Sequence, residues 1–458
     1  MKVNTFEKKI INDKIKGLSD QEIGNKYNIN LKQIEKIITK EKGINVTKLN
    51  KSKKINNLFP KDFKLENNTV WSFKSRGNWA THNGNYRGNW SPYIPRNVIL
   101  KYSNENDTVL DYFCGSGTTA VECKLLNRNF IGIDINEKAI ELARENLNFQ
   151  FLFTSNIDLK VGDARNLNFI KDNSIDLICA HPPYANIINY TYDNNNDLSH
   201  LDLDKFLIEI KKVADESYRV LKENKYCAIL IGDTRKNKHI VPLGFWLIEK
   251  YLEAGFKIKE IVIKRQHNCK TTGFWYKNSI KYNFLLLAHE YLVVFEKTKK
   301  KVQYHDKNVS NIFYLIDENI YLESTTVWIF NKEEYINNII SNLVKRYSKN
   351  YCIYNNNFHE NSDLIIYFYD KNFNSFIKYM EKVKNNSIVA IVCEDIREEN
   401  NLIYSEPIFI EKELRNNNNF KIKEIVIIAI NNYSNNINNN KNNLNINHKY
   451  ILIYQKVN

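Results

Sequence analysis

A strand, a glycine turn, a helix and a second strand follow one another over residues 109–134, and this order restricts the folds open to the chain. The first apolar run ends at Asp111, the turn at 115–119 reads GSGTT, and the second apolar run ends at Asp134. Glycines let a ligand approach the backbone closely, and an acid at a strand end can hold the hydroxyl groups of a ribose. The segment therefore predicts a βαβ unit that can bind a ribose-containing ligand.

The turn differs from the two familiar phosphate-binding motifs. It is not G-x-G-x-x-G, and no Walker lysine follows it. Phosphate binding is therefore the less favoured interpretation. On this segment alone, a turn with a purely structural role stays open.

A second motif lies downstream, where a buried-strand pattern runs directly into two prolines. Residues 174–180 read SIDLICA and continue into HPPY at 181–184, and an earlier acid, Asp163, follows a glycine. A short apolar run of this kind is typical of a buried strand. Prolines at a strand exit would on their own only end the hydrogen-bond ladder. Together with the turn and its acids they form a specific combination.

FCGSGTT at 113–119 and HPPY at 181–184 resemble motifs of the S-adenosylmethionine-dependent DNA amino-methyltransferases. These enzymes modify N6 of adenine or N4 of cytosine. The first motif resembles the family's cofactor loop and the second its catalytic tetrapeptide, and the resemblance covers residues 71–297. It implies S-adenosylmethionine as the cofactor. It also implies a target base flipped out of the duplex, because a stacked base cannot present its amino group.

The resemblance implies a role for each site residue. Asp134 would bind the ribose of the cofactor, and Asp163 would accept from the adenine amino group. Asp111 would support the turn or the methionyl ammonium. Tyr184 would stack on the flipped base, while His181 and the Pro182 carbonyl accept hydrogen bonds from its amino group. The expected cofactor-binding residues are Asp111, Phe113, Gly115, Gly117, Thr118, Asp134 and Asp163, and the expected catalytic residues are His181, Pro182, Pro183 and Tyr184.

His181 departs from the family's pattern, which usually has Asp, Asn or Ser at this position. A neutral imidazole can accept one hydrogen bond and a protonated one cannot. Activity should therefore fall as the pH drops below the His181 pKa, whose reference value is about 6.5. The alternative is a histidine that only caps the strand.

Composition narrows the class of protein. The chain has 458 residues and a net charge of +14, which fits a polyanionic partner. Abundant Lys, Asn and Ile also fit AT-rich coding, so charge alone is a modest argument. The N-terminus lacks an apolar signal core and no run reaches membrane-spanning length, so we expect a cytoplasmic protein. Seven cysteines without a CxxC pair predict neither disulfides nor a metal site.

The N-terminal region predicts a small helical domain over residues 1–46, followed by a linker over 47–64. Ser19 and Glu22 form a capping-box pattern, and two short helical patterns separated by a tight turn indicate a helix-turn-helix. The expected DNA-reading face contains Lys32, Gln33 and Lys36. A helical cap that touches no DNA is the alternative.

The catalytic domain is expected over residues 65–299. Strand and helix patterns alternate there, which predicts a parallel sheet with helices on both faces and an antiparallel last strand at the sheet edge. Residues 264–282 are expected to form a loop, with Arg265, Lys270 and Trp275 contacting DNA, unless it is a solvated hairpin tip. A helix near residues 97–102 precedes the cofactor turn. This segment order resembles the family's gamma arrangement, whereas FCGSGTT resembles the beta arrangement, so the target base stays open.

Residues 300–458 repeat the catalytic domain in a degenerate form. FKIKEIVI occurs at 256–263 and at 420–427, and other matches such as HEYL at 289–292 and HKYI at 448–451 keep the same order. The position of Pro-Pro-Tyr reads Phe368-Tyr369-Asp370, so the copy has lost its chemistry. We expect it to mimic a dimer mate or to form a DNA-recognition surface. Chance similarity between Ile- and Lys-rich segments is the alternative.

The predicted fold class is α/β: a Rossmann-like methyltransferase sheet between a small helix-turn-helix domain and a degenerate second methyltransferase-like domain. The predicted function is site-specific DNA methylation, as the modification part of a restriction-modification system. Expected partners are double-stranded DNA and a cognate restriction endonuclease, with no membrane, in a monomer with an internal pseudo-dimer or a homodimer. The alternatives are an RNA base amino-methyltransferase and a DNA-binding regulator with a vestigial methyltransferase fold.

Overall fold

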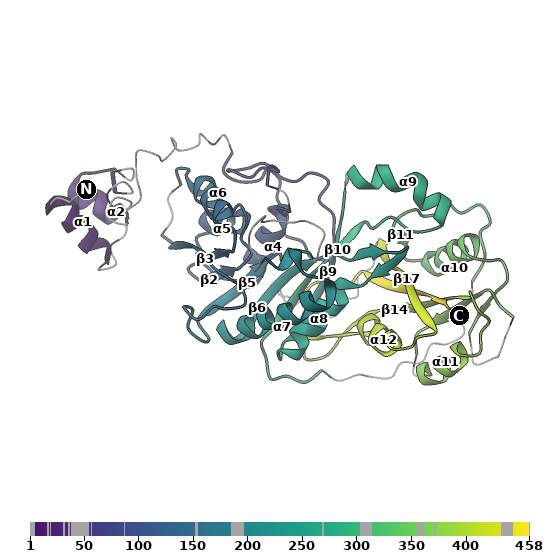
Figure 1. Cartoon of the computed structure of the whole chain (residues 1–458). Coiled ribbons are helices and arrows are strands. Elements are labelled where there is room, and N and C mark those ends of the chain that lie inside the picture. The colour runs from purple at the N-terminus through teal and green to yellow at the C-terminus, as the bar shows by residue number, and fades with distance from the viewer. Residues whose placement is uncertain are drawn as a thin grey trace.

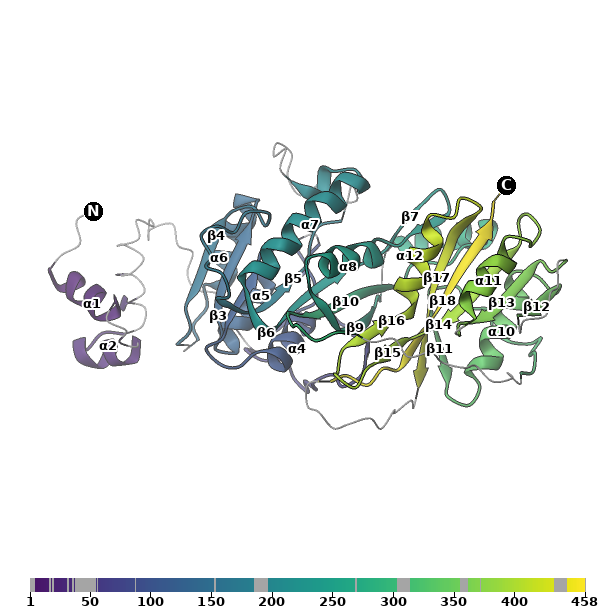
Figure 2. The same ribbon diagram turned by 90° about the horizontal axis from the view of Figure 1, so that it is seen from below.

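Two β-sheets with flanking helices make up most of the molecule in the computed structural model (Figures 1 and 2). The first sheet has eight strands and the second has six, and two short hairpins accompany them. The structure describes residues 5–15, 18, 20–30, 33–34, 37, 55, 57–86, 88–151, 154–184, 197–267, 270–302, 314–354, 361–370, 372–431 and 443–457.

The first sheet has the strand order β1-β9-β10-β6-β5-β2-β3-β4. Its neighbours pair in parallel, except that β10 is antiparallel to both β6 and β9. The strands are β1 (Val70–Trp71), β2 (Thr108–Asp111), β3 (Asn129–Asp134), β4 (Ile157–Val161), β5 (Ile175–Ala180), β6 (Leu221–Ile231), β9 (Lys257–Arg265) and β10 (His289–Glu296).

Helices cover both faces of this sheet, as the alternating pattern predicted. Side chains of α7 and α8 pack on one face, and those of α4, α5 and α6 pack on the other. The helices are α4 (Tyr93–Tyr102), α5 (Thr118–Leu125), α6 (Glu137–Leu147), α7 (Leu203–Val220) and α8 (Leu243–Glu253). Among the described residues, none of the helices combines the length and apolar character needed to cross a bilayer.

Helix α7 shows why these segments fold as they do. Asp202 caps its first turn by accepting from the backbone N–H of Lys205, and Phe206, Ile210 and Val213 recur on one buried face. Residues 203–220 were predicted to be helical, and this prediction is confirmed.

Two predictions about the end of this unit were wrong. The antiparallel strand β10 lies between β6 and β9 instead of at the sheet edge, because β9 and the short β1 extend the sheet beyond it. Residues 270–282, expected in a loop, form helix α9 (Lys270–Tyr282). The segment has no proline and a single glycine, so its mixed cationic and aromatic composition is compatible with a helix.

The second sheet repeats the strand order of the first. Its order β11-β17-β18-β14-β13-β12 matches β1-β9-β10-β6-β5-β2 position by position, and β18, like β10, is its antiparallel strand. No strand beyond β12 occurs in the described part of this sheet. The strands are β11 (Val327–Asn331), β12 (Tyr351–Ile353), β13 (Leu364–Phe368), β14 (Ile388–Cys393), β17 (Phe420–Asn431) and β18 (His448–Lys456), and the helices are α10 (Tyr335–Arg346), α11 (Phe373–Met380) and α12 (Glu406–Arg415).

Reciprocal ion pairs join the two sheets. Arg235 in the hairpin β7 (Thr234–Lys236) and β8 (His239–Val241) donates to Glu424 of β17 at 2.6 Å. Arg397 in the matching hairpin β15 (Asp395–Arg397) and β16 (Ile403–Ser405) donates to Glu260 of β9. Both glutamate side chains are fully buried. Each unit thus supplies the same residue pair, with the partners exchanged.

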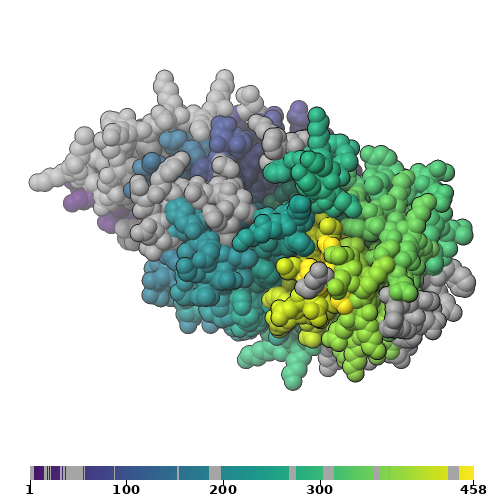
Figure 3. All heavy atoms as spheres, turned by 45° about the vertical axis from the view of Figure 1, so that its right-hand side comes forward, coloured from purple at the N-terminus to yellow at the C-terminus, as the bar shows by residue number. Residues whose placement is uncertain are grey.

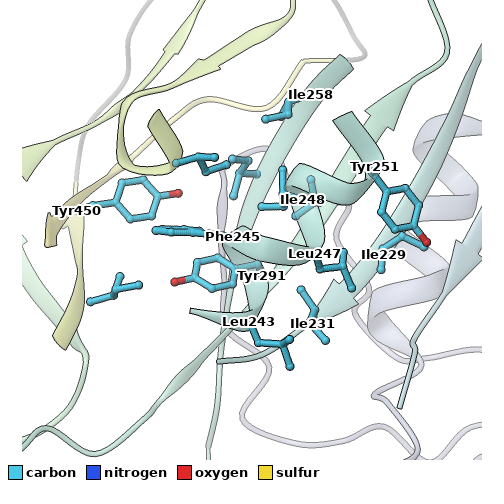
Figure 4. Packing of buried hydrophobic residues seen from close by; sticks show 14 of the residues in the cluster. Ile229, Ile231, Leu243, Phe245, Leu247, Ile248, Tyr251, Ile258, Tyr291 and Tyr450 are labelled. Atoms are coloured by element: carbon cyan, nitrogen blue, oxygen red, sulfur yellow. The ribbon is translucent and has the colours of Figure 1, made fainter. Parts of the chain in front are cut away.

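A second set of exchanged contacts lies where β10 and β18 begin. Thr69 Oγ1 is 2.7 Å from His448 Nδ1, and Thr326 Oγ1 is 2.8 Å from His289 Nδ1. Phe245 packs between Tyr291 and Tyr450 at the same junction (Figure 4). The two units therefore meet like the halves of a two-fold dimer.

The N-terminal helices form a small core of their own. They are α1 (Thr5–Ile15) and α2 (Asp20–Tyr27), and Ile10, Ile23, Ile34 and Ile37 pack together. Helix α1 was not predicted, while α2 coincides with the first predicted helix. Lys32 and Lys36, from the predicted DNA-reading face, lie outside the described residues, and Gln33 is exposed with its side chain bonded to the Asn30 backbone.

The exchanged ion pairs lead to a stability prediction. Arg397→Met leaves the Glu260 carboxylate buried without its cation, so we expect the free energy of unfolding to fall by about 3–5 kcal/mol. Denaturant unfolding measures the loss. Substituting Glu260→Met as well should recover most of it, and Lys205→Met, which removes an exposed pair, should cost at most about 1 kcal/mol. An equal, small loss in all three variants would contradict the interface described here.

Candidate functional site

A pocket with about 730 Å³ of empty space, its open mouth included, lies at the carboxyl ends of β2, β3 and β5. This is the edge where open parallel sheets bind ligands. Its walls come from the turn after β2, the end of β3, the segment after β4 and the tetrapeptide after β5. Among the predicted residues, those that line it are Phe113, Gly115, Asp134, Asp163, His181 and Pro183.

The glycine turn is required by its backbone and its neighbours. Gly115 and Gly117 have φ values of +49° and +83°, which side chains disfavour. A Cβ on Gly117 would lie 2.9 Å from the Cβ of Ala143 in α6, and one on Gly115 would approach the Tyr86 ring at 3.1 Å. Gly117 thus allows α5 and α6 to pack closely, while Gly115 leaves room beside a wall of the cavity.

Asp134 holds the turn and faces the cavity. Its Oδ2 accepts from the Gly115 N–H at 2.8 Å and its Oδ1 from the Asn136 N–H at 2.9 Å. Burial raises its pKa to about 6, and these hydrogen bonds limit the rise. The carboxylate is ionised at neutral pH and can accept from the hydroxyls of a ribose.

Asp111 lies beneath the turn and is 2% exposed. It accepts from the Phe113 N–H at 3.0 Å and from the Thr119 hydroxyl at 2.6 Å. Burial raises its pKa to about 7, with Thr119 opposing the shift. Of its two expected roles, the geometry fits support of the turn. Thr118 likewise begins α5 and donates to the side chain of Asn89.

Asp163 borders the cavity from the segment after β4. Arg165 donates to both of its carboxylate oxygens, at 2.9 Å and 2.6 Å. Burial alone would raise the Asp163 pKa, but the hydrogen bonds from Arg165 outweigh burial and hold the pKa below its usual value. Arg165 is itself bound to Glu209 of α7. Asp163 is therefore an ionised acceptor in a fixed orientation.

The residues present fit the cofactor implied by the sequence. Asp134 offers a carboxylate to vicinal hydroxyls, and Asp163 offers one to an exocyclic amine. Phe113, Ile135 and Ala164 add apolar wall for a flat ring.

A second cavity adjoins the first and shares four residues with it: Gly88, Asn89, Trp90 and His181. Its other walls include Tyr184 and the buried carboxylate of Glu290, together with four cationic side chains: Lys74, Arg76, Lys264 and Arg265. His181 and its neighbours therefore form a common wall, with Asp134 and Asp163 on one side and a basic, aromatic hollow on the other.

His181 is held by aromatic and backbone contacts. Its ring stacks on Trp90 with centroids 5.7 Å apart, and its Nε2 is 3.3 Å from the Tyr184 hydroxyl. Arg76 fixes the backbone there by donating to the carbonyls of Asn89 and Trp90, both at 2.7 Å. Burial lowers the His181 pKa to about 4, although Glu290 opposes the shift.

This pKa changes one expectation from the sequence. With the reference value, His181 would lose its acceptor lone pair below pH 6.5. In the folded protein the neutral imidazole persists until the pH approaches 4, because desolvation disfavours the charged form. An acid limb near pH 6.5 is therefore no longer expected from this residue.

The structure places the predicted DNA-contacting residues in different locations. Arg265 lines the second cavity. Trp275 lies on α9 and is 47% exposed. Lys270 begins α9, but its side chain lies outside the described part of the chain.

The sequence reasoning missed Lys264 and Glu290, which border the second cavity. A signal was available in the repeat. The first unit reads FKIKEIVIK and the second FKIKEIVII, so Ile428 replaces Lys264. Likewise HEYL in the first unit matches HKYI in the second, so Lys449 replaces Glu290.

Two histidines with lowered pKa values predict part of the pH dependence of stability. His181 and His289 have pKa values lowered by burial to about 4 and about 3, against about 6.5 in the unfolded chain. Below pH 6.5 the unfolded state binds more protons at these two histidines, so the stability that they contribute is full above about pH 7 and is lost as the pH is lowered towards 4. Denaturant unfolding should show His181→Asn losing about 1–2 kcal/mol less than the parent between pH 7 and pH 5. Parallel curves for the two proteins would contradict this.

Comparisons with known proteins agree with the geometry. Residues 5–145 match a family model described as DNA methylase, and residues 103–264 match one described as Methyltransferase domain. The type II methyltransferase M.HpaI of Haemophilus parainfluenzae is 38% identical over 133 residues, which are 28% of this chain and 39% of that protein. The type II methyltransferase M1.MboII of Moraxella bovis is 53% identical over 51 residues, 11% of this chain and 20% of that protein.

A tRNA (guanine(10)-N2)-dimethyltransferase of Methanothermobacter thermautotrophicus is 34% identical over 101 residues, 22% of this chain and 29% of that protein. The chain spans less than half the length of each of these curated relatives. The part of the chain that forms the first sheet is thus similar to DNA methylases and type II methyltransferases, which agrees with S-adenosylmethionine as the expected cofactor.

Proposed function

We propose that this protein is a site-specific DNA methyltransferase acting on the exocyclic amino group of a flipped cytosine or adenine, as the modification part of a restriction-modification system. The observation that carries the proposal is the junction of the two cavities at His181. A cofactor bound beside Asp134 and a base beside Tyr184 would meet across this residue.

The chain's own groups would orient the base and its amino group. Tyr184 offers its ring for stacking, and the neutral His181 imidazole and the Pro182 carbonyl offer acceptors for the two amino hydrogens. These hydrogen bonds draw the nitrogen lone pair out of conjugation with the ring. The bound cofactor supplies an activated methyl group, so positioning and electrostatics are what the protein has to add. Asp134, Asp163 and the glycine turn would hold that cofactor.

Helix α9 is the proposed contact with the duplex around the flipped base. It projects from the surface beside the junction of the two sheets (Figures 1 and 3). Trp275, Tyr276 and Tyr282 are 42–47% exposed on it, and Lys277 and Lys281 add cations without any acid in the helix. Cations that meet phosphates and aromatics that stack on bases favour nucleic acid.

The C-terminal unit would serve as a built-in dimer partner. Its interface residues repeat those of the first unit, while its described residues lack a counterpart of β3 and β4, which carry or precede Asp134 and Asp163. In this proposal one copy binds the cofactor and the other supports it, so the chain acts as a monomer with an internal pseudo-dimer.

A labelled-methyl assay on the purified full chain tests the function. Methyl transfer from S-adenosylmethionine to unmodified genomic DNA should yield N4-methylcytosine or N6-methyladenine, identified by nuclease digestion and mass spectrometry. A tRNA pool is the parallel arm, because one relative is a tRNA dimethyltransferase. Transfer to tRNA and none to DNA would overturn the proposal in favour of an RNA enzyme. Cofactor binding without transfer to either would favour a regulator.

His181 substitutions test the acceptor role. His181→Ala should lower kcat by about a hundredfold, because the amino group loses its alignment. His181→Asn keeps an acceptor oxygen and should retain much more activity. Between pH 5.5 and 8 the parent should show no decline due to His181, since its pKa is about 4. Equal losses in the two variants would argue for a packing role instead.

A further inference from the structure

We propose that Glu290 is a positioning residue that keeps the Tyr184 hydroxyl from occupying the acceptor nitrogen of His181. This inference rests on the proposed function, because it concerns the base-facing side of the same site. Glu290 would act through Tyr184, without touching the base or the cofactor.

The Tyr184 hydroxyl lies within reach of two acceptors, Glu290 and His181. The Tyr184 hydroxyl donates to Glu290 Oε1 at 2.9 Å, and the same hydroxyl lies 3.3 Å from His181 Nε2. A phenol has one proton to donate. A charged carboxylate is the stronger acceptor, so the proton points to Glu290 and the lone pair of His181 stays available for the amino group of the base.

Lys264 keeps the carboxylate in the required state. Its Nζ donates to Glu290 Oε2 at 2.7 Å. Burial alone would raise the Glu290 pKa, but Lys264 and the hydrogen bond from Tyr184 outweigh burial and hold the pKa below its usual value. Glu290 is 8% exposed. A buried anion with these partners accepts from Tyr184 throughout the working pH range.

Gly232 provides the space for this contact. A Cβ at this position would lie 3.2 Å from the Tyr184 hydroxyl oxygen and 3.2 Å from Glu290 Cγ. Both distances are tighter than ordinary van der Waals contact. The end of β6 is therefore shaped to let the tyrosine and the carboxylate meet.

The second unit shows that the fold itself does not need this arrangement. Strand register matches Gly232 with Glu394 and Glu290 with Lys449. There Lys449 donates to Glu394, while the neighbouring His448 and Tyr450 keep the contacts of their counterparts. Burying a carboxylate is costly unless it is paired. Because only the first unit has a carboxylate at the position of Glu290, we attribute this carboxylate to the functional site and not to the interface.

Glu290→Ala tests the proposal in the full chain. Without the carboxylate, the tyrosine hydroxyl should turn to His181 and compete with the base, lowering kcat at least about tenfold, as expected for loss of a hydrogen bond to a charged group. The KM for S-adenosylmethionine should not change. Adding Tyr184→Phe removes the competing proton, so the double variant should regain the activity of Tyr184→Phe alone.

This rescue separates the proposal from a merely structural role. Independent losses that multiply in the double variant would overturn it, and so would an equal weakening of cofactor binding measured by calorimetry. Glu296→Ala, on the same strand and bound to Lys300, is the matched control and should retain parental kcat. A parent that transfers no methyl group at all would instead overturn the proposed function.

A second variant covers the case in which Glu290→Ala does not fold. Gly232→Ala should push the Tyr184 hydroxyl away from Glu290 and lower kcat, and Tyr184→Phe should again restore activity because the crowded oxygen is gone. Failure of Tyr184→Phe to restore a folded Gly232→Ala protein would also count against the proposal.

Discussion

The interface between the two sheets depends on buried carboxylates, each of which needs a cation from the opposite unit. Glu260 and Glu424 are fully buried carboxylates whose cations come from the opposite unit. A buried charge without its partner costs several kcal/mol, so neither unit is complete alone. The contacts also fix β9 and β10, the strands that carry Lys264 and Glu290 into the site.

Because the fold is duplicated, matching positions of the two units can be compared to see which residues are kept and which differ. The threonine, histidine, arginine and glutamate at the junction occur in both units, because each forms half of an exchanged contact. The tyrosine that bonds to each histidine is also kept. The positions around the cavities diverge. Ile353 stands where the first unit has Asp111, and Phe368 stands where it has His181, as the matched registers of β12 and β13 show. Shared residues thus serve the interface, and unshared residues serve the site.

Much of the fold could be predicted from local sequence. The turn at 115–119 and the tetrapeptide at 181–184 were found because backbone geometry and strand termination demand particular residues there. The alternation of strands and helices followed from apolar periodicity. The repeat was found because FKIKEIVI and the histidine-tyrosine pairs serve the same interface twice.

What the sequence could not predict depends on distant contacts. The position of β10 between β6 and β9 depends on which strands pair, and no local sequence pattern determines this pairing. The lowered pKa of His181 comes from desolvation by residues far away in the chain, with a smaller contribution from the charge of Lys264. Glu290 looked like an ordinary strand residue until the structure placed it against Tyr184, more than a hundred positions earlier.

The arrangement at His181 also explains how a histidine can replace a side chain that does not titrate near neutrality. Asparagine or serine offers an acceptor at every pH, and an imidazole does so only while it is neutral. Trp90 stacks on one face of the ring, and desolvation raises the cost of charging it, so its pKa falls to about 4. The His181 imidazole therefore stays neutral around neutral pH. It can accept a hydrogen bond there, provided that no neighbouring donor occupies its lone pair. The carboxylate of Glu290, by accepting from the Tyr184 hydroxyl, keeps that donor from His181.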